Sequence, residues 1–168
     1  MEIEEIKTKR MVLRVFTPDL YRLIFTNFTK SEELLQALNF TSIEELELER
    51  DKHFKGTCTY NKSFVKFKLI ATDSNLPIGN CHFHTWYLQH QRAEIGYDLF
   101  NEAYKRKGYM SEAMEAVLHY GFTRMNLNRF GFSKEGYLRE HHKSEEVFHD
   151  SFIFSLLKKE FESNQTIK

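Results

Sequence analysis

Alternating apolar and polar residues predict β-strands along much of this chain. Residues 11–16 follow a period of two, and the same period returns over residues 64–71 before a turn at residues 73–75. Further alternating runs span residues 78–87 and 93–100. Because short polar connections join the last three runs, we expect them to form neighbouring antiparallel strands.

Apolar residues three and four positions apart predict helices between the strands. The dipeptide Thr17-Pro18 begins a first helix, residues 31–38 suggest a second short turn, and the capping box Ser42-Ile-Glu-Glu45 begins another helix. The clearest helical pattern is the continuous apolar face from Gly108 to about Asn126.

The end of the chain predicts two more strands. They cover residues 133–140 and 147–158, and a polar loop at residues 141–146 separates them. Strands followed by one long helix and then by further strands are typical of an α+β domain. We therefore predict a single domain over residues 1–168, with a mixed, mostly antiparallel sheet flanked by helices.

Composition narrows the class of protein. The 168 residues carry 24 basic and 24 acidic side chains, so bulk charge does not favour a nucleic-acid partner. No apolar run approaches the roughly 18 residues of a membrane helix, so no membrane partner is expected. The N-terminus lacks the pattern of a signal peptide, and Cys58 and Cys81 form no disulfide framework. These features predict a cytoplasmic protein.

Three cations and a glycine form the strongest local signal for a binding site. Lys105, Arg106 and Lys107 follow a predicted strand, and Gly108 begins the long helix. The first N–H groups of a helix have no partner within the helix and carry the positive end of its dipole. The sequence therefore predicts an anion cradle over residues 105–110. The alternative is an ordinary solvated basic surface.

Other chemical patterns are weaker. His82 and His84 share one face of a strand at a spacing that could hold a metal ion, but no third ligand lies nearby, so we expect no metal. Nucleophile-elbow, Walker and Rossmann motifs are absent from the sequence, which argues against a hydrolase, an NTPase and a dehydrogenase. An exposed aromatic patch at Phe83, Trp86 and Tyr87 would instead indicate a binding module.

Three segments carry a family resemblance. In order, Ala93-Glu-Ile-Gly-Tyr-Asp-Leu99, Lys107-Gly-Tyr-Met-Ser-Glu-Ala113 and His119-Tyr-Gly-Phe122 resemble the GNAT superfamily of acyl-CoA-dependent N-acetyltransferases. The resemblance is closest to the RimJ/RimL type, which acetylates the N-termini of ribosomal proteins. It implies acetyl-CoA as cosubstrate, a peptide or small-molecule amine as acceptor, and a homodimer as a compatible assembly.

The resemblance also implies where the cosubstrate lies. Acetyl-CoA would run along the strand that ends at Leu99 and Phe100, with its phosphates on residues 105–110. The family's pyrophosphate motif, Q/R-x-x-G-x-G/A, reads Lys105-Arg-Lys-Gly-Tyr-Met110 here, so both ends depart from it while the central glycine remains. The implied cofactor-binding residues are Leu99, Phe100, Lys105, Arg106, Lys107, Gly108, Tyr109 and Met110.

Catalytic groups follow from the same resemblance. Glu94 stands where related enzymes carry a glutamate that removes the proton of the amine, and the alternative is a strand carboxylate paired with a nearby cation. Tyr109 or Tyr97 would protonate the leaving thiolate, although each is also explained as a packed aromatic residue. The helical region of residues 17–55 and the loop at residues 141–146 would frame the acceptor.

One departure from the family follows Phe130. About 20 residues that relatives carry there, the length of one strand and one short helix, are absent. The unit is deleted, left out of this stretch of sequence, or replaced by a partner chain. A true deletion would favour a second reading, a CoA-binding or protein-binding remnant without transferase activity.

Overall fold

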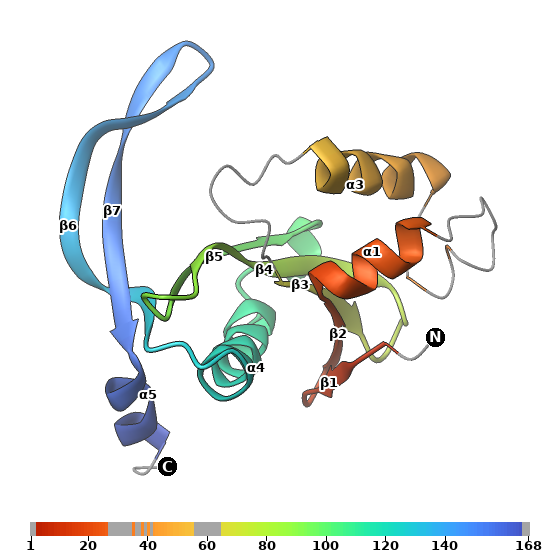
Figure 1. The fold of residues 1–168 in the computed structure, drawn as a ribbon, viewed down its shortest axis with the longest axis horizontal. Coiled ribbons are helices and arrows are strands. Elements are labelled where there is room, and N and C mark those ends of the chain that lie inside the picture. The colour runs from red at the N-terminus through yellow and green to blue at the C-terminus, as the bar shows by residue number, and fades with distance from the viewer. Residues whose placement is uncertain are drawn as a thin grey trace.

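The computed structural model describes residues 3–26, 35, 38, 40, 42–55 and 65–165. Figure 1 shows a central sheet with helices on both faces and a long hairpin near the C-terminus. The elements, in chain order, are β1 (Glu5–Lys7), β2 (Met11–Phe16), α1 (Pro18–Thr26), α3 (Ile43–Lys55), β3 (Val65–Ala71), β4 (Pro77–Tyr87), β5 (Arg92–Leu99), the 3₁₀ helix η1 (Glu102–Tyr104), α4 (Tyr109–Arg124), β6 (Arg129–Ser144), β7 (Val147–Leu157) and α5 (Lys158–Gln165).

The described strands form one seven-stranded sheet in the order β1 to β7. Every neighbouring pair is antiparallel except β5 and β6, which run parallel. Helices α1 and α3 lie over one face of the sheet and α4 lies over the other (Figure 1). The predicted α+β class and the mixed, mostly antiparallel sheet are therefore confirmed.

The larger hydrophobic core lies between the sheet and α4. Phe67 and Phe83 are fully buried, and their rings meet edge to face at 5.4 Å. Phe130, which follows α4, stacks on Phe83 at 5.1 Å. A Cβ atom at Gly121 would come within 2.2 Å of the Phe130 ring, so the close approach of α4 requires glycine there. Because Phe83 is buried, the aromatic patch of a binding module is not formed.

A second core lies between the sheet and helices α1 and α3. It gathers Phe16, Tyr21 and Leu46 with other buried apolar residues. Lys68 of β3 points toward this side and is only 1% exposed. Its Nζ lies 3.5 Å from a carboxylate oxygen of Glu45 and 3.6 Å from the centre of the Phe40 ring. The alternation along β3 predicts that Lys68 points to this side of the sheet. The residues that bury its ammonium group come from other segments of the chain, which the alternation does not reveal.

The predicted loop at residues 141–146 is wrong, because most of it is strand. Pairing of β6 with β7 continues to Ser144 opposite Val147, which leaves two residues for the turn. Glu145 and Glu146 have φ angles of 48° and 65°, so both adopt the left-handed conformation of a tight two-residue hairpin turn. Polar residues are tolerated in this part of the ribbon because both of its faces are exposed.

The C-terminal strand also ends in a helix that the sequence pattern does not predict. Helix α5 begins at Lys158, and Glu160 accepts the backbone N–H of Leu157 at 2.9 Å, which closes its first turn. Phe161 then packs against Phe122 of α4, with ring centres 5.0 Å apart. A helix of eight residues makes only about two turns, which is too short for its apolar positions to form a recognisable period in the sequence.

Two features singled out in the sequence lie outside the described residues. The short turn predicted at residues 31–38 falls mostly outside them, as does Cys58. Among the residues that are described, no helix combines the length and the apolar character needed to cross a membrane.

Candidate functional site

One edge of β5 is open along most of its length. On one side β5 pairs with β4 from Tyr87 opposite Arg92 to Gly79 opposite Leu99. On the other side β6 meets it at a single position, Arg92 opposite Arg129. From residue 93 to residue 99, no strand lies against this edge in the described part of the chain. Its backbone groups can therefore pair with an extended ligand. The N–H of Phe100, next along the chain, donates instead to Ile78 at 3.0 Å.

The loop between η1 and α4 has the backbone geometry of an anion site. Arg106 and Gly108 have φ angles of 59° and 79°, so two left-handed residues lie close together. Such alternation of backbone conformation turns successive N–H groups toward one side. Gly108 also caps α4 with no side-chain hydrogen bond to the helix, so the helix begins with donors available to a ligand.

A depression of about 440 Å³ joins the end of β5 to this loop. Its volume falls within the range of small-molecule sites. The structure thus brings together Leu99, Lys105, Arg106 and Met110, four of the residues expected to bind the cofactor. Lys107 and Gly108 adjoin it in the chain, and both are exposed. The depression is lined by Tyr97, Asp98, Leu99, Lys105, Arg106 and Met110.

Arg10 contacts the loop from the turn between β1 and β2, and sequence patterns do not reveal this contact. Its Nε donates to Glu112 Oε2 at 2.7 Å, and its backbone N–H donates to Glu112 Oε1 at 2.8 Å. Its Nη1 donates to the carbonyl of Lys107 at 3.0 Å, and its guanidinium lies 4.1 Å from the centre of the Tyr109 ring. No local motif in the sequence links Arg10 to a residue 102 positions away.

The charge of Glu112 is set by these contacts. Burial raises the pKa of the Glu112 carboxyl, but hydrogen bonds from Thr8 and Arg10, together with the charge of Arg10, outweigh burial and lower the pKa below its ordinary value. Glu112 is therefore ionised at neutral pH. A carboxylate in the first turn of α4 would compete with a bound anion, and Arg10 compensates its charge.

Glu94 lies on the face of β5 turned away from α4. Ala93, its neighbour, is buried in the core against α4, and successive strand residues point to opposite faces. The Glu94 side chain is exposed, and Thr85 Oγ1 donates to it at 3.3 Å. Two residues on, a Cβ at Gly96 would come within 2.4 Å of the His82 ring, so this imidazole covers the strand beside Glu94.

The two tyrosines predicted as acids differ in their surroundings. Tyr97 is 56% exposed and lines the depression. Tyr109 does not line it; its ring packs edge to face against Tyr104 at 5.5 Å and beneath Arg10. The contacts of Tyr109 are those of a packed aromatic residue at the start of α4.

The described part of the chain gives little evidence for a metal site or for a reactive thiol. It contains no group of three or more His, Cys, Asp or Glu side chains placed to hold a metal ion. The side chain of His84 lies outside the described part of the chain, and with it the predicted His82–His84 pair. Burial, reinforced by the charge of Asp98, raises the pKa of the Cys81 thiol to about 12, so Cys81 is no nucleophile.

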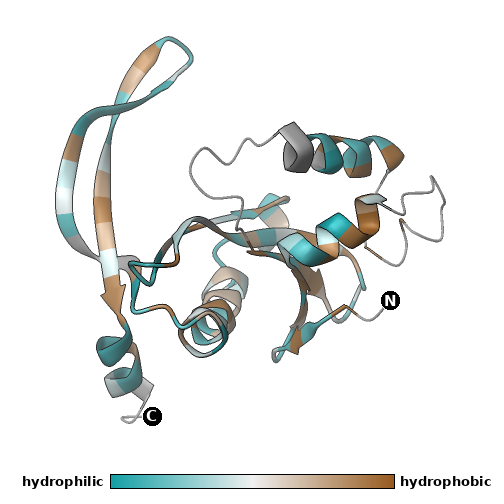
Figure 2. Cartoon of the chain, in the orientation of Figure 1, coloured by the Kyte–Doolittle hydropathy of each residue, from teal (hydrophilic) through white to brown (hydrophobic). Residues whose placement is uncertain are grey.

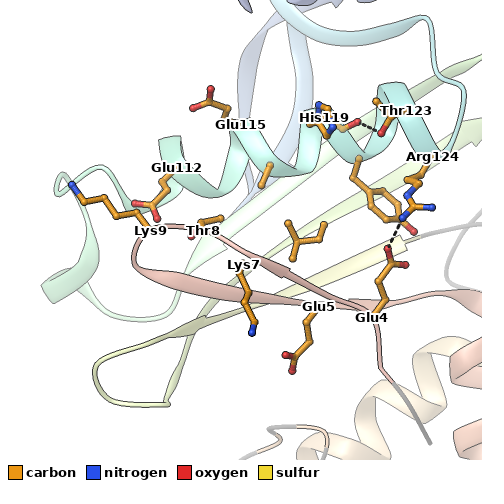
Figure 3. Close-up of a pocket in the computed structure, with 13 residues that line it drawn as sticks. Glu4, Glu5, Lys7, Thr8, Lys9, Glu112, Glu115, His119, Thr123 and Arg124 are labelled. Atoms are coloured by element: carbon orange, nitrogen blue, oxygen red, sulfur yellow. Dashed lines mark hydrogen bonds and ion pairs between the residues drawn. The ribbon is translucent and has the colours of Figure 1, made fainter.

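A larger depression of about 740 Å³ lies between β1 and α4 (Figure 3). Its walls carry charges of both signs, and Glu4 pairs with Arg124 across it at 4.0 Å. No residue of β5 lines it. The smaller depression, with its open strand edge and its helix start, is therefore the stronger candidate for the site.

A family model and a curated relative point to the same family of proteins. Residues 10–148 match the family model for the acetyltransferase (GNAT) domain. The chain is 31% identical over 155 residues to p20 of Bacillus licheniformis, an uncharacterized N-acetyltransferase, with 82% of this chain and 77% of p20 covered.

Two solved structures share the fold. RimL, a ribosomal alpha-N-protein acetyltransferase in complex with coenzyme A, superposes with a TM-score of 0.65 at 18% identity, covering 94% of this chain and 99% of that one. A chimera of the spermidine N-acetyltransferase SpeG from Vibrio cholerae with hSSAT gives 0.63 at 18% identity, covering 91% and 98%.

Proposed function

This chain belongs to the GNAT acetyltransferase family, and from that premise we propose that it binds acetyl-CoA between β5 and the start of α4 and transfers the acetyl group to a primary amine. The observation that carries the proposal is the open edge of β5 ending beside the cationic, left-handed loop. An enzyme that uses a CoA thioester needs both parts, because the cosubstrate has an amide-rich arm and a charged phosphate end.

Each part of the site has a task in this proposal. The edge of β5 up to Leu99 pairs with the amides of the arm, and Phe100 closes that end of the strand. Lys105, Arg106 and Lys107 attract the phosphates, and the N–H groups from Gly108 onward receive them. Met110, in the first turn of α4, completes the wall, and Tyr109 supports the loop from beneath Arg10. Asp98 is the one acid among the lining residues, which favours placing the phosphates nearer the loop than the strand.

Transfer requires a free amine. An alkylammonium has a pKa near 10, so it must lose a proton before its nitrogen attacks the thioester carbonyl. We assign this proton to Glu94, directly or through water, because its carboxylate is exposed on β5. The C–N bond then forms as the C–S bond breaks, and the leaving sulfur takes a proton. Tyr97, exposed in the depression, is the better placed of the two tyrosines to donate it.

The acceptor would bind on the face of the sheet covered by α1 and α3, the face that carries Glu94. Asn80, opposite Asp98 on the neighbouring strand, has a buried Oδ1 with no hydrogen-bond partner among the described residues. This oxygen can accept an N–H of the acceptor. The names of the two structural neighbours, one for a protein N-terminus and one for spermidine, support a peptide or polyamine amine.

Three finer points belong to the same proposal. We place the enzyme with the RimJ/RimL type and in the cytoplasm. We also propose that a strand–helix unit is missing after Phe130, and the continuation of β6 from Arg129 past Phe130 to Ser144 supports this. The single contact of β6 with β5 is consistent with such a loss.

Turnover tests the function and the role of Glu94. Incubated with acetyl-CoA, the protein is expected to release free thiol with spermidine or with a peptide that has a free N-terminus, and not with the same peptide blocked. Glu94→Gln is expected to lower kcat about 100-fold, the usual effect of losing a general base. Asp73→Asn, the same change in an exposed turn, is the control. Cosubstrate binding without thiol release for any amine would favour the remnant without activity.

A homodimer through the β6–β7 hairpin is also part of the proposal. Tyr137, Phe152 and Phe154 form a row of contacting rings that are 49%, 53% and 45% exposed. Apolar residues recur along this ribbon, and its turn end stands away from the helices (Figure 2). Two strands alone are marginally stable in water, and β7 is the outer strand of the described sheet. A second copy pairing with β7 would cover the rings.

Sedimentation velocity tests this assembly. Wild type is expected to sediment as a dimer at micromolar concentrations, while Phe152→Lys stays monomeric because the new charge would be buried in the interface. Leu76→Lys makes the same kind of change at a leucine that is 57% exposed in the β3–β4 turn, and it should dimerise like wild type. A monomeric wild type, or a dimer that survives Phe152→Lys, would contradict the assignment.

A further inference from the structure

We propose that Arg10 is a positioning residue that holds the cofactor loop in its binding conformation. The inference rests on the proposed function, since it concerns the same loop. Arg10 belongs to the turn between β1 and β2, at the opposite end of the sequence from the loop it contacts, and it does not line the depression itself.

The contacts of Arg10 fix two parts of the loop at once. Its side chain donates to the carbonyl of Lys107 at 3.0 Å and to the carboxylate of Glu112 at 2.7 Å, so one planar guanidinium joins the residue before the helix cap to the first turn of α4. The ring of Tyr109 lies against the guanidinium face. The backbone N–H of Arg10 adds a second hydrogen bond to Glu112, which holds the β1–β2 turn to the helix.

The loop needs this support because its conformation is unfavourable by itself. A residue other than glycine, such as Arg106, is strained in the left-handed region because its Cβ comes too close to the following carbonyl oxygen. The peptide between Lys107 and Gly108 is planar and trans, so its C=O and N–H point in opposite directions. Holding the Lys107 carbonyl on Arg10 therefore turns the Gly108 N–H away from Arg10 and leaves it available to a ligand.

Arg10 also acts through charge. Glu112 stands in the first turn of the helix that is to receive phosphates, and its carboxylate opposes them unless a cation compensates it. Removing Arg10 would both release the Lys107 carbonyl and leave this carboxylate uncompensated. Removing both charged partners restores the charge balance but not the hydrogen bond to Lys107. The two contributions can therefore be separated.

Calorimetric titration with acetyl-CoA provides the test. Arg10→Gln is expected to raise Kd about tenfold or more, the effect of losing a hydrogen bond between charged groups. Arg10→Gln combined with Glu112→Gln should recover part of the loss. Arg10→Lys keeps the charge but lacks the fork, so it should retain most of the defect. Arg22→Gln removes an exposed arginine paired with Asp19 on α1 and should bind like wild type.

Kinetics and hydrogen exchange separate positioning from general destabilisation. At saturating acetyl-CoA, Arg10→Gln should keep kcat within about twofold while KM for acetyl-CoA rises, whereas misfolding would lower kcat. In the protein without cosubstrate, amides of residues 105–112 should exchange faster in Arg10→Gln than in Arg22→Gln. Unchanged Kd and unchanged exchange in Arg10→Gln would overturn the inference while leaving the proposed function standing. A wild type that does not bind acetyl-CoA would overturn the proposed function, and the exchange comparison would still decide whether Arg10 holds the loop.

Discussion

Reversing the charge of the cofactor loop is expected to weaken the binding of acetyl-CoA about 100-fold or more. In the variant Lys105→Glu/Lys107→Glu, two cations that face the proposed phosphates become anions, and repulsion replaces attraction at both positions. Charges a few ångströms apart near a protein surface interact by about 4 kcal/mol at an effective dielectric constant of 20, so Kd should rise about 100-fold or more. Calorimetric titration of wild type and variant measures this change.

The control for this variant changes net charge equally at another place. Lys7→Glu/Lys159→Glu reverses two exposed lysines that lie outside the loop, on β1 and α5, and acetyl-CoA should bind it nearly as tightly as wild type. Lys105 already pairs with Glu102 at 2.5 Å, so Lys107→Glu alone should carry the larger share of the effect. Raising the salt concentration should narrow the difference between wild type and variant. Equal affinities for the variant and its control would mean that the phosphates bind elsewhere.

The sheet could be predicted because burial imposes a period on each strand. Strands β2 to β5 and helix α4 lie within one or two residues of the predicted bounds, and each of them packs apolar residues against the core under the sheet. The hairpin could not be predicted in the same way. Its residues beyond Glu140 are polar on both faces, and only pairing with β7 makes them strand. The sequence pattern does not predict helix α5, because its position depends on the contact between Phe161 and Phe122, which lie far apart in sequence.

The candidate site likewise has one part that the sequence predicts and another that it does not. The sequence shows three cations before a glycine. In the structure Gly108 adopts a left-handed conformation at the start of α4, which explains why glycine stands there. The open edge of β5 cannot be seen there, because it depends on where β6 diverges. Arg10 is hidden for a similar reason, since its partners are set by how the β1–β2 turn packs against α4. Local chemistry was thus predictable, and the contacts that hold it in place were not.

Truncating Phe130 is expected to be the most destabilising single change considered. Its ring is 1% exposed and meets Phe83 at 5.1 Å and Phe122 at 4.7 Å, where the chain passes from α4 into the hairpin. Phe130→Ala would leave a cavity in this aromatic cluster, and such changes lower the free energy of unfolding by about 3–5 kcal/mol. For a chain of this size, Tm should fall by roughly 2–4 °C per kcal/mol.

The matched control makes the same truncation at an exposed ring. Phe148 is 58% exposed near the hairpin turn, so Phe148→Ala should change stability by no more than about 0.5 kcal/mol. Both variants are compared in a Phe152→Lys background, so that self-association contributes to neither. Thermal unfolding followed by circular dichroism gives the two Tm values. A small loss for Phe130→Ala would mean that the aromatic cluster does not anchor the hairpin.

Hydrogen exchange in Phe130→Ala then tests whether residues 1–168 form one domain. Phe130 belongs to the core under the sheet and is also the second residue of β6, so a single cooperative unit would transmit its loss in both directions. Amides of β3, at residues 65–71, and of β7, at residues 147–157, should lose protection by the same free energy. Loss confined to β7 would instead make the hairpin a separate unit that folds onto an independently stable sheet, and the single-domain prediction would be wrong.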